Sequence, residues 1–311
     1  MNFYLIDGSS YVYRAYHAIK TLSSSKGLPT NAIYGFTTMV MKLMREKKPD
    51  RLCIVFDSPV PTERHRLYEE YKAQRPEAPR DLVLQVPHIK EVIAALGVPT
   101  LELPGYEADD LICTLAKKAA GLGIAVFIVT GDKDMMQVVN DVIKIYDPMK
   151  DLIIGEPQVR ERFGIPPERI PELMALAGDA IDNIPGVKGI GEKTARDLLQ
   201  KFESLDDLLE HPERIERERL RTMITENVDV IRLSRSLATV NTEIALDVGP
   251  DDVKTREPDW RRLLELFTEF EFKSLIAQVP SAGKEARGDY AAITTRQDLI
   301  EFLGGEGREP R

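Results

Sequence analysis

Nine acidic side chains in this sequence have the type and spacing needed to hold divalent metal ions. Three of them, Asp7, Asp57 and Asp132, each follow a short apolar run of strand length. The other six form small clusters along the chain: Glu107, Asp109, Asp110, Asp134, Asp179 and Asp182. Carboxylate oxygens without accompanying His or Cys favour Mg²⁺ or Mn²⁺ over zinc.

A gathering of these acids would require bound cations or protons. Two carboxylates ~4 Å apart repel each other by about 4 kcal/mol at an effective dielectric near 20. Mg²⁺ usually takes only one or two carboxylates, so nine acids predict two or more metal positions. Paired ions suit phosphodiester hydrolysis, in which one activates water and the other stabilises the leaving 3′ oxygen. Taken singly, the clusters also have ordinary explanations, namely a favourable helix dipole at 107–110 and a solvated turn at 132–134.

The elements that must position these acids alternate between strand and helix in the first half of the chain. Apolar runs predict strands at 3–6, 51–56, 99–103 and 125–130, and helical periodicity predicts helices at 11–19, 33–45, 89–96 and 108–120. This order predicts an α/β fold with a mostly parallel sheet flanked by helices, which binds ligands beyond the carboxyl ends of its strands. We expect an α/β core over 1–170, a helical part over 171–280, and at 281–311 a linker with a strand at 290–294 and a helix at 296–303 that begin a further domain.

Composition narrows the class of protein. The 311 residues carry 51 acids and 42 bases, for a net charge of −9. Apolar runs are far shorter than the ~20 residues that span a bilayer, and Cys53 and Cys113 lack metal-ligand spacing. We therefore expect a cytoplasmic protein with core thiols and no membrane partner. We also expect a monomer, although composition does not determine the oligomeric state. The acidic balance argues against a general nucleic-acid coat but allows a local basic track.

A glycine-rich segment at 185–195 could bind phosphate before a helix that runs to about residue 200. Its glycines let backbone N–H groups approach an anion, and its lysines add positive charge. The candidate DNA contacts here are Gly186, Lys188, Gly189, Gly191, Lys193 and Thr194. The Walker spacing is absent, and a purely structural turn is the alternative.

A proline-bounded excursion at 58–87 is the second candidate DNA contact. Bases mixed with aromatic residues suit a single strand. The bases here are interleaved with Tyr68 and Tyr71, and they are Arg64, His65, Arg66, Lys72, Arg75 and Arg80. We expect it to be exposed and partly helical, with an ordinary amphipathic surface helix as the alternative.

Together and in this order, the motifs resemble the 5′ nuclease domain of bacterial DNA polymerase I, which is related to phage and eukaryotic flap endonucleases. The resemblance covers about residues 2–279 and rests on segments 5–8, 55–57, 105–110, 130–134, 178–195 and 266–275. It implies a PIN-like core and metal-dependent cleavage of DNA at 5′ flaps and 5′ ends, as in primer removal and repair.

The resemblance also implies roles for individual residues. The nine acids named above match the family's metal-site acids, Lys72 and Arg75 match bases of a mobile arch, and Arg14 matches a basic residue near the same site. Residues 185–200 resemble a helix-three-turn-helix, a helix-hairpin-helix type of DNA clamp that in relatives often holds K⁺. The implied partners are flapped, nicked or gapped DNA, RNA primer ends, and a polymerase domain in the same or another chain.

Two other functions remain compatible with the sequence. A non-catalytic DNA-junction-binding module of a polymerase would bind flaps without cutting them. A small-molecule phosphatase or an RNA-directed nuclease would explain the Asp132-x-Asp134 pattern but not the lysine-bearing hairpin.

Overall fold

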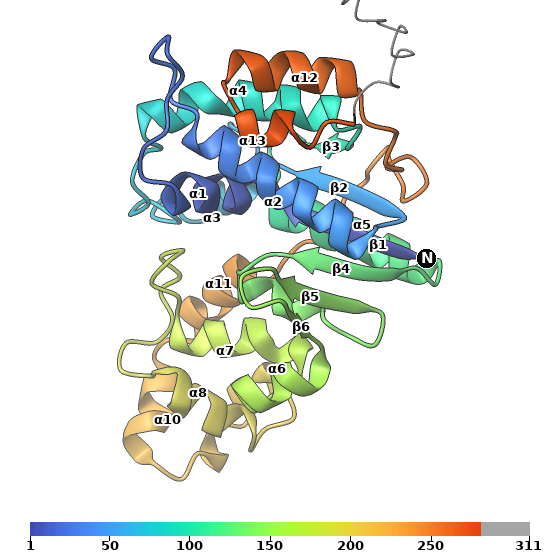
Figure 1. Cartoon of the computed structure of the whole chain (residues 1–311). Helices are drawn as coiled ribbons and strands as arrows, with labels where there is room; N and C mark the ends of the chain where they lie inside the picture. Colours follow the sequence, from blue (N-terminus) through green and yellow to red (C-terminus); the bar gives the residue numbers. More distant parts are fainter. Residues whose placement is uncertain (281–311) are drawn as a thin grey trace, which may run out of the picture.

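A six-stranded sheet forms the centre of the protein (Figure 1), whose structure, a computed structural model, describes residues 1–280. The strand order is β3-β2-β1-β4-β5-β6, and neighbouring strands are parallel except for the β5–β6 pair. The strands are β1 (Asn2–Asp7), β2 (Arg51–Val55), β3 (Thr100–Leu101), β4 (Ala125–Val129), β5 (Ile143–Asp147) and β6 (Leu152–Ile154). Because β2, β1 and β4 are parallel neighbours, their carboxyl ends lie together at one edge.

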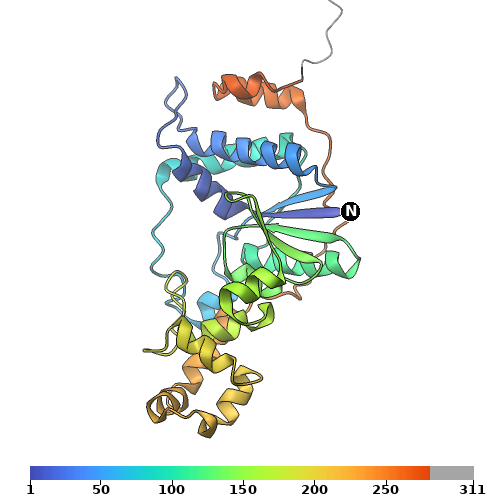
Figure 2. The ribbon, with the colours of Figure 1, turned by 60° about the horizontal axis from the view of Figure 1, so that its bottom comes forward.

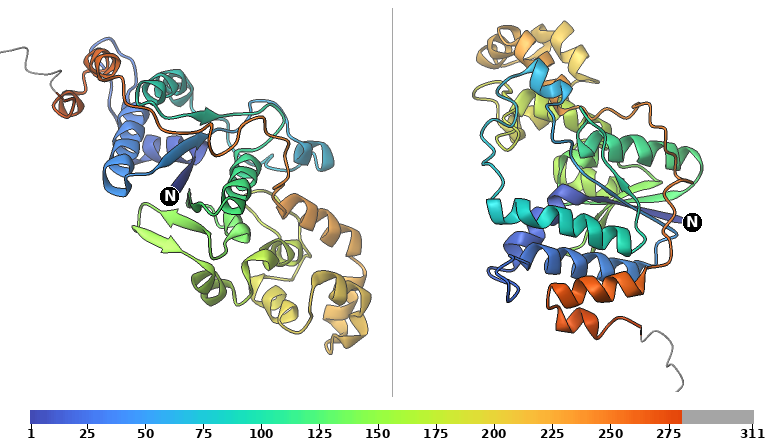
Figure 3. Two further views of the ribbon diagram at one scale, coloured as in Figure 1. Left: turned by 90° about the vertical axis from the view of Figure 1, so that its right-hand side faces the viewer. Right: turned by 90° about the horizontal axis from the view of Figure 1, so that it is seen from above.

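Helices cover both faces of the sheet, as Figure 3 shows from two sides. Alternate residues of β1 enter two separate cores, in keeping with the two-residue repeat of a strand. Phe3 and Leu5 pack toward α5 (Ala108–Gly121), while Tyr4 and Ile6 pack toward α1 (Gly8–Ala18), α2 (Asn31–Lys47) and α4 (Arg80–Ala95). The expected parallel sheet with two helical layers is confirmed.

Short helices follow the sheet and extend to one side of it (Figure 2). They are α6 (Glu156–Phe163), α7 (Ile170–Ala177), α8 (Glu192–Leu199), α9 (Leu205–Glu210), α10 (Glu218–Thr225) and α11 (Val228–Ala238). Helix α7 is the centre of this group, since it packs against both α8 and α11.

The chain then returns to the α/β part, contrary to the expectation of one helical part over 171–280. Helix α12 (Trp260–Glu269) packs on α4, and α13 (Lys273–Ile276) follows it. Leu263, Leu266 and Phe267 are fully buried in the core that α2 and α4 share with the sheet. Helical structure was expected over this stretch, but only the fold shows which layer the helix covers.

Proline positions misled the prediction at α4, which was expected to begin at residue 89. The helix begins at Arg80 and contains Pro87, whose ring is exposed. Leu82, Gln85 and Ile89 repeat at helical spacing and are buried, so packing of this face outweighs the hydrogen bond that proline removes.

Two strands of the sheet, β5 and β6, were not predicted. Strand β6 has only three residues, and Lys144 interrupts the apolar pattern of β5.

The remaining expectations concern the cysteines, the membrane and the end of the chain. Cys53 and Cys113 are buried and unpaired within the described chain, as expected. Over residues 1–280, no helix is both long and apolar enough to cross a bilayer. The strand and helix predicted at 290–303 lie outside the described residues.

Candidate active site

Two of the predicted acids stand where strand ends meet helix N-termini. Asp7 ends β1, and its carboxylate accepts hydrogen bonds from the Ser10 amide at the start of α1 (2.9 Å) and from the Thr130 hydroxyl (3.3 Å). Asp57 follows β2 and accepts from the Ala108 amide, the first residue of α5, at 2.9 Å. The positive ends of α1 and α5 therefore face the same edge of the sheet.

Four more acids line one cavity of about 440 Å³ at this edge. They are Asp132, Asp134, Asp179 and Asp182, and the basic residues Arg14, Lys133 and Arg162 line the same cavity. The last two acids come from the loop after α7, which the paired backbone hydrogen bonds between Asp179 and Ile184 close into a tight turn. Arg162 was not singled out in the sequence, because its place on α6 gave no signal of its proximity.

Burial and mutual repulsion raise the pKa of several of these carboxyl groups. Burial, with the neighbouring Asp57 and Asp132, raises the pKa of Asp7 to about 7. Burial, with Asp132 and Asp179, raises the pKa of Asp134 to about 8. Asp109 is affected in the same way, since burial and the charges of Asp7 and Asp132 raise its pKa well above the ordinary value. These acids share one electrostatic environment, as the sequence predicted.

Basic side chains neutralise other acids of the group. Lys72 Nζ lies 2.9 Å from Glu107 Oε2 and 3.6 Å from Asp182 Oδ2, Arg75 Nη2 lies 2.6 Å from Asp182 Oδ1, and Lys133 Nζ lies 2.5 Å from Asp179 Oδ2. Among residues 1–280, no three acidic, His or Cys side chains come close enough to enclose one ion. The acids therefore gather at one edge with their oxygens partly held by bases, and they do not form a finished metal cage.

The chemistry of the donors nevertheless fits hard divalent cations. Asp134 Oδ1 is buried and has no hydrogen-bond partner among the described residues, and such an atom is costly unless something binds it. A cation can displace the protons held by carboxyl groups of raised pKa. Asp134 therefore offers an oxygen that a metal ion would satisfy.

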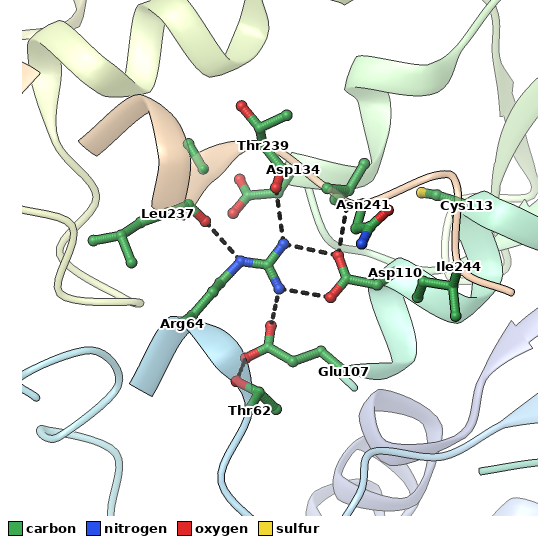
Figure 4. A network of polar contacts seen from close by, with 12 residues as sticks. Thr62, Arg64, Glu107, Asp110, Cys113, Asp134, Leu237, Thr239, Asn241 and Ile244 are labelled. Carbon is green, nitrogen blue, oxygen red and sulfur yellow. Dashed lines mark hydrogen bonds and ion pairs between the residues drawn. The ribbon is translucent and has the colours of Figure 1, made fainter. Parts of the chain in front are cut away.

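Glu107 and Asp110 lie in a second, buried network (Figure 4). Glu107 Oε2 accepts hydrogen bonds from Lys72, Tyr71 (3.1 Å) and Arg64 (3.1 Å). Asp110 differs from the other eight acids because both of its oxygens face Arg64, each at 2.8 Å. The structure thus places Asp110 in an ion pair, where the sequence had predicted a metal ligand.

The segment at 58–87 is less exposed than predicted. Arg64, on α3 (Glu63–Leu67), and Tyr71 are buried, so neither can meet a DNA strand as proposed. Arg75 is half exposed and Lys72 lies at the edge of the site. No pattern in a single sequence could show that Arg64 pairs with an acid 46 positions away.

The side chain of Arg14 reaches the acidic cavity by packing against the backbone of Gly131. A Cβ atom at Gly131 would lie 2.6 Å from Arg14 Nη2, so the guanidinium rests directly on this backbone. Arg14 Nη1 is buried and makes no hydrogen bond to any described residue. This donor, beside the acidic cavity, could bind an oxygen of a phosphate.

The glycine-rich hairpin divides into exposed and structural positions. Lys188, Gly189, Gly191 and Lys193 are exposed before α8, and Thr194 is half-buried. Gly186, by contrast, is buried with φ 56°, and its amide donates to Ser234 Oγ at 3.0 Å. Its predicted role as a phosphate contact is therefore wrong, since its N–H group is already bonded inside the protein.

Comparison with known proteins shows the family to which this chain belongs. The family described as "5'-3' exonuclease, N-terminal resolvase-like domain" matches residues 2–164, and "5'-3' exonuclease, C-terminal SAM fold" matches residues 165–261. The chain therefore belongs to the 5′-3′ exonuclease family, as the resemblance implied.

Individual relatives are of two lengths. The "5'-3' exonuclease" of Aquifex aeolicus is 41% identical over 91% of this chain and 96% of its own. The thermostable DNA polymerase I of Thermus aquaticus is 42% identical over 88% of this chain, but this chain covers only 32% of it. The chain thus spans nearly all of one relative and about a third of the other.

Solved structures share the fold. T5 5′-exonuclease, solved with bound divalent metal ions (zinc), has a TM-score of 0.66 at 18% identity, covering 90% of this chain and 99% of its own. The catalytic core of Rad2 in complex with DNA substrate has a TM-score of 0.60 at 16% identity, covering 89% and 91%.

The raised pKa values predict how stability depends on pH without metal. Above the ordinary pKa of 3.8, the unfolded chain releases protons that the folded protein keeps on Asp7 and Asp134. In EDTA the melting temperature should therefore fall between about pH 5 and about pH 8. Glu107 and Asp179 have lowered pKa values, so their titration changes stability only at pH values below this range.

Calorimetry across this pH range, in EDTA and in excess Mg²⁺, tests the expectation. Mg²⁺ should raise the melting temperature more at pH 8 than at pH 5.5, and Asp134→Asn should reduce the loss of stability in EDTA. A melting temperature in EDTA that stays level or rises across the window would show that these carboxyl groups do not titrate as described.

Proposed function

We propose that this chain is a structure-selective 5′ nuclease that hydrolyses DNA phosphodiester bonds at 5′ flaps and 5′ ends, in primer removal and repair. The observation that carries the proposal is Asp134 Oδ1, a buried oxygen without a partner among residues 1–280, in a cavity lined by four acids and by Arg14. Membership of the 5′-3′ exonuclease family supports it. A buried carboxylate oxygen without a partner destabilises the protein. A module that only bound DNA junctions would have no use for such an oxygen.

The acids at the carboxyl edge of the sheet would hold two or more Mg²⁺ or Mn²⁺ ions, directly or through water. The candidates are Asp7, Asp57, Glu107, Asp109, Asp132, Asp134, Asp179 and Asp182. Bound there, the ions would supply positive charge for phosphodiester hydrolysis. The T5 5′-exonuclease structure contains divalent metal ions, which supports a metal requirement of the shared fold.

Three basic residues would then bind the phosphate that is cut. In this structure Lys72 pairs with Glu107, and Arg75 pairs with Asp182. Cations that neutralise these two acids would free both bases to contact the DNA. Arg14 Nη1 already has a free donor within the described chain. Charged donors placed beside developing negative charge stabilise the transition state.

The exposed hairpin would hold the duplex next to the cut. Lys188 and Lys193 supply positive charge, and the exposed Gly189 and Gly191 let a phosphate approach the backbone. We infer that it binds duplex DNA with a K⁺ ion and that the protein acts as a cytoplasmic monomer on flapped, nicked or gapped DNA and on RNA primer ends. The lengths of the relatives support cooperation with a polymerase domain, in the same chain or another.

One cleavage assay tests the proposed function. An end-labelled 5′-flap duplex is incubated with the protein in Mg²⁺ or in EDTA, and binding is measured in parallel. We expect cleavage near the flap junction in Mg²⁺ and none in EDTA. Uncut flap in Mg²⁺, under conditions where the protein binds it, would favour the binding module instead.

Loss of one hairpin charge should weaken duplex binding without stopping catalysis. Lys188→Ala should lower affinity for duplex DNA and reduce the slope of log affinity against log salt by about 1, because one phosphate contact is lost. Lys42→Ala removes an exposed lysine from α2 and serves as the matched control. An unchanged salt slope for Lys188→Ala would rule out the hairpin as a DNA contact.

A further inference from the structure

The buried guanidinium of Arg64 joins three separate parts of the protein (Figure 4). Arg64 lies on α3, Glu107 and Asp110 begin α5, and the carbonyls of Leu237 and Thr239 end α11. The segment before Lys72, the acids of the site and the last helix of the helical part therefore meet at one side chain.

Every donor of this guanidinium is used. Nε donates to the Leu237 carbonyl (2.9 Å), Nη1 to Glu107 (3.1 Å) and Asp110 (2.8 Å), and Nη2 to Asp110 (2.8 Å) and the Thr239 carbonyl (2.9 Å). An arginine has five N–H groups, and all five have acceptors here. A lysine could not reproduce this arrangement, because it offers three donors from one point.

Both carboxylate oxygens of Asp110 are held by hydrogen bonds. Its Oδ1 atom accepts from Arg64 and from the Asn241 amide (2.8 Å), and its Oδ2 atom accepts from Arg64. Separating a buried ion pair of this kind leaves an uncompensated charge. Binding a metal ion through Asp110 would require that separation, whereas Asp109, one position earlier, feels the charges of Asp7 and Asp132.

We propose that Arg64 is a positioning residue for the proposed nuclease reaction, with Asp110 as its permanent counterion and not as a metal ligand. Arg64, Lys72 and Tyr71 all donate hydrogen bonds to the same oxygen of Glu107, Oε2. It also fixes α3, and so the start of the segment that carries Lys72 and Arg75, against the end of α11. The inference rests on the proposed function but concerns which acids hold metal and what orients them.

A comparison of two adjacent acids tests the role of Asp110 without any cleavage. Mn²⁺ binding to the full chain is measured by titration calorimetry without DNA, for the parent, Asp109→Asn and Asp110→Asn. We expect Asp109→Asn to weaken Mn²⁺ binding at least tenfold and Asp110→Asn to change it less than threefold. Equal losses in the two variants would overturn the assignment of Asp110, while no Mn²⁺ binding by the parent would instead contradict the proposed function.

A volume-matched pair of substitutions tests Arg64. Arg64→Met with Asp110→Leu removes both buried charges together, so the double variant should fold where Arg64→Met alone is destabilised. Circular dichroism and melting temperature establish folding. In the folded double variant we expect kcat on a 5′ flap to fall at least tenfold while KM changes less than threefold.

A purely structural role predicts a different result. The folded double variant would then cut with the kcat of the parent, and the proposal would be wrong. Arg64→Lys provides a further check, since it keeps the charge but loses the fork of donors. It should remain well below the parent in kcat even where its melting temperature is close to that of the parent.

Discussion

Asp134→Asn should lower the rate of flap cleavage by about a thousandfold, which corresponds to about 4 kcal/mol of transition-state stabilisation. The buried Oδ1 atom, which no described residue satisfies, is the oxygen we expect a cation to bind. Asparagine keeps the shape and one oxygen but loses the negative charge that attracts a metal ion. Single-turnover cleavage of an end-labelled flap in Mg²⁺ measures the effect, and gel-shift binding in EDTA should be nearly unchanged.

Asp147→Asn is a suitable control for this variant. Asp147 ends β5, in the same sheet, and its carboxylate accepts a hydrogen bond from the Met149 amide without lining the acidic cavity. It should cut at nearly the parent rate. If Asp134→Asn cleaved within tenfold of the parent, the central place of Asp134 in metal binding would have to be abandoned.

Part of the candidate site could be predicted because it depends on local patterns. The apolar runs that end at Asp7, Asp57 and Asp132 mark buried parallel strands, and such strands bring their carboxyl ends together. The helix that begins at Ala108 was equally clear from its periodicity. Sequence spacing therefore located the edge of the sheet at which these acids lie.

The rest depends on contacts between residues far apart in the chain, which a single sequence does not specify. Lys72 meets Asp182 across 110 positions, and Arg64 meets Asp110 across 46. The same limit applies to Gly186, whose type suggested phosphate binding while its contact with Ser234 makes it structural. Charge alone could not show which bases are exposed and which neutralise acids inside the protein.

The second large effect is expected at Lys72. Its Nζ atom lies between Glu107 and Asp182, and its backbone has φ 55°, a strained conformation for a lysine, held by a hydrogen bond from its amide to the Asp182 carbonyl (3.0 Å). Burial alone would lower its pKa, but Glu107, Asp182 and Asp109 raise the pKa above its ordinary value, so the amine is charged at any working pH. Lys72→Ala should lower the single-turnover cleavage rate about a hundredfold, because a fixed positive charge beside the phosphate is lost.

Metal binding distinguishes this loss from a damaged site. In the absence of DNA, Lys72 competes with cations for Glu107, so Lys72→Ala should bind Mn²⁺ at least as well as the parent, by calorimetry. Lys47→Ala, which removes a lysine paired with Asp151 far from these acids, should change neither cleavage nor metal binding. Weaker Mn²⁺ binding by Lys72→Ala would mean that the lysine orders the acids, and its charge would then not act on the phosphate as proposed.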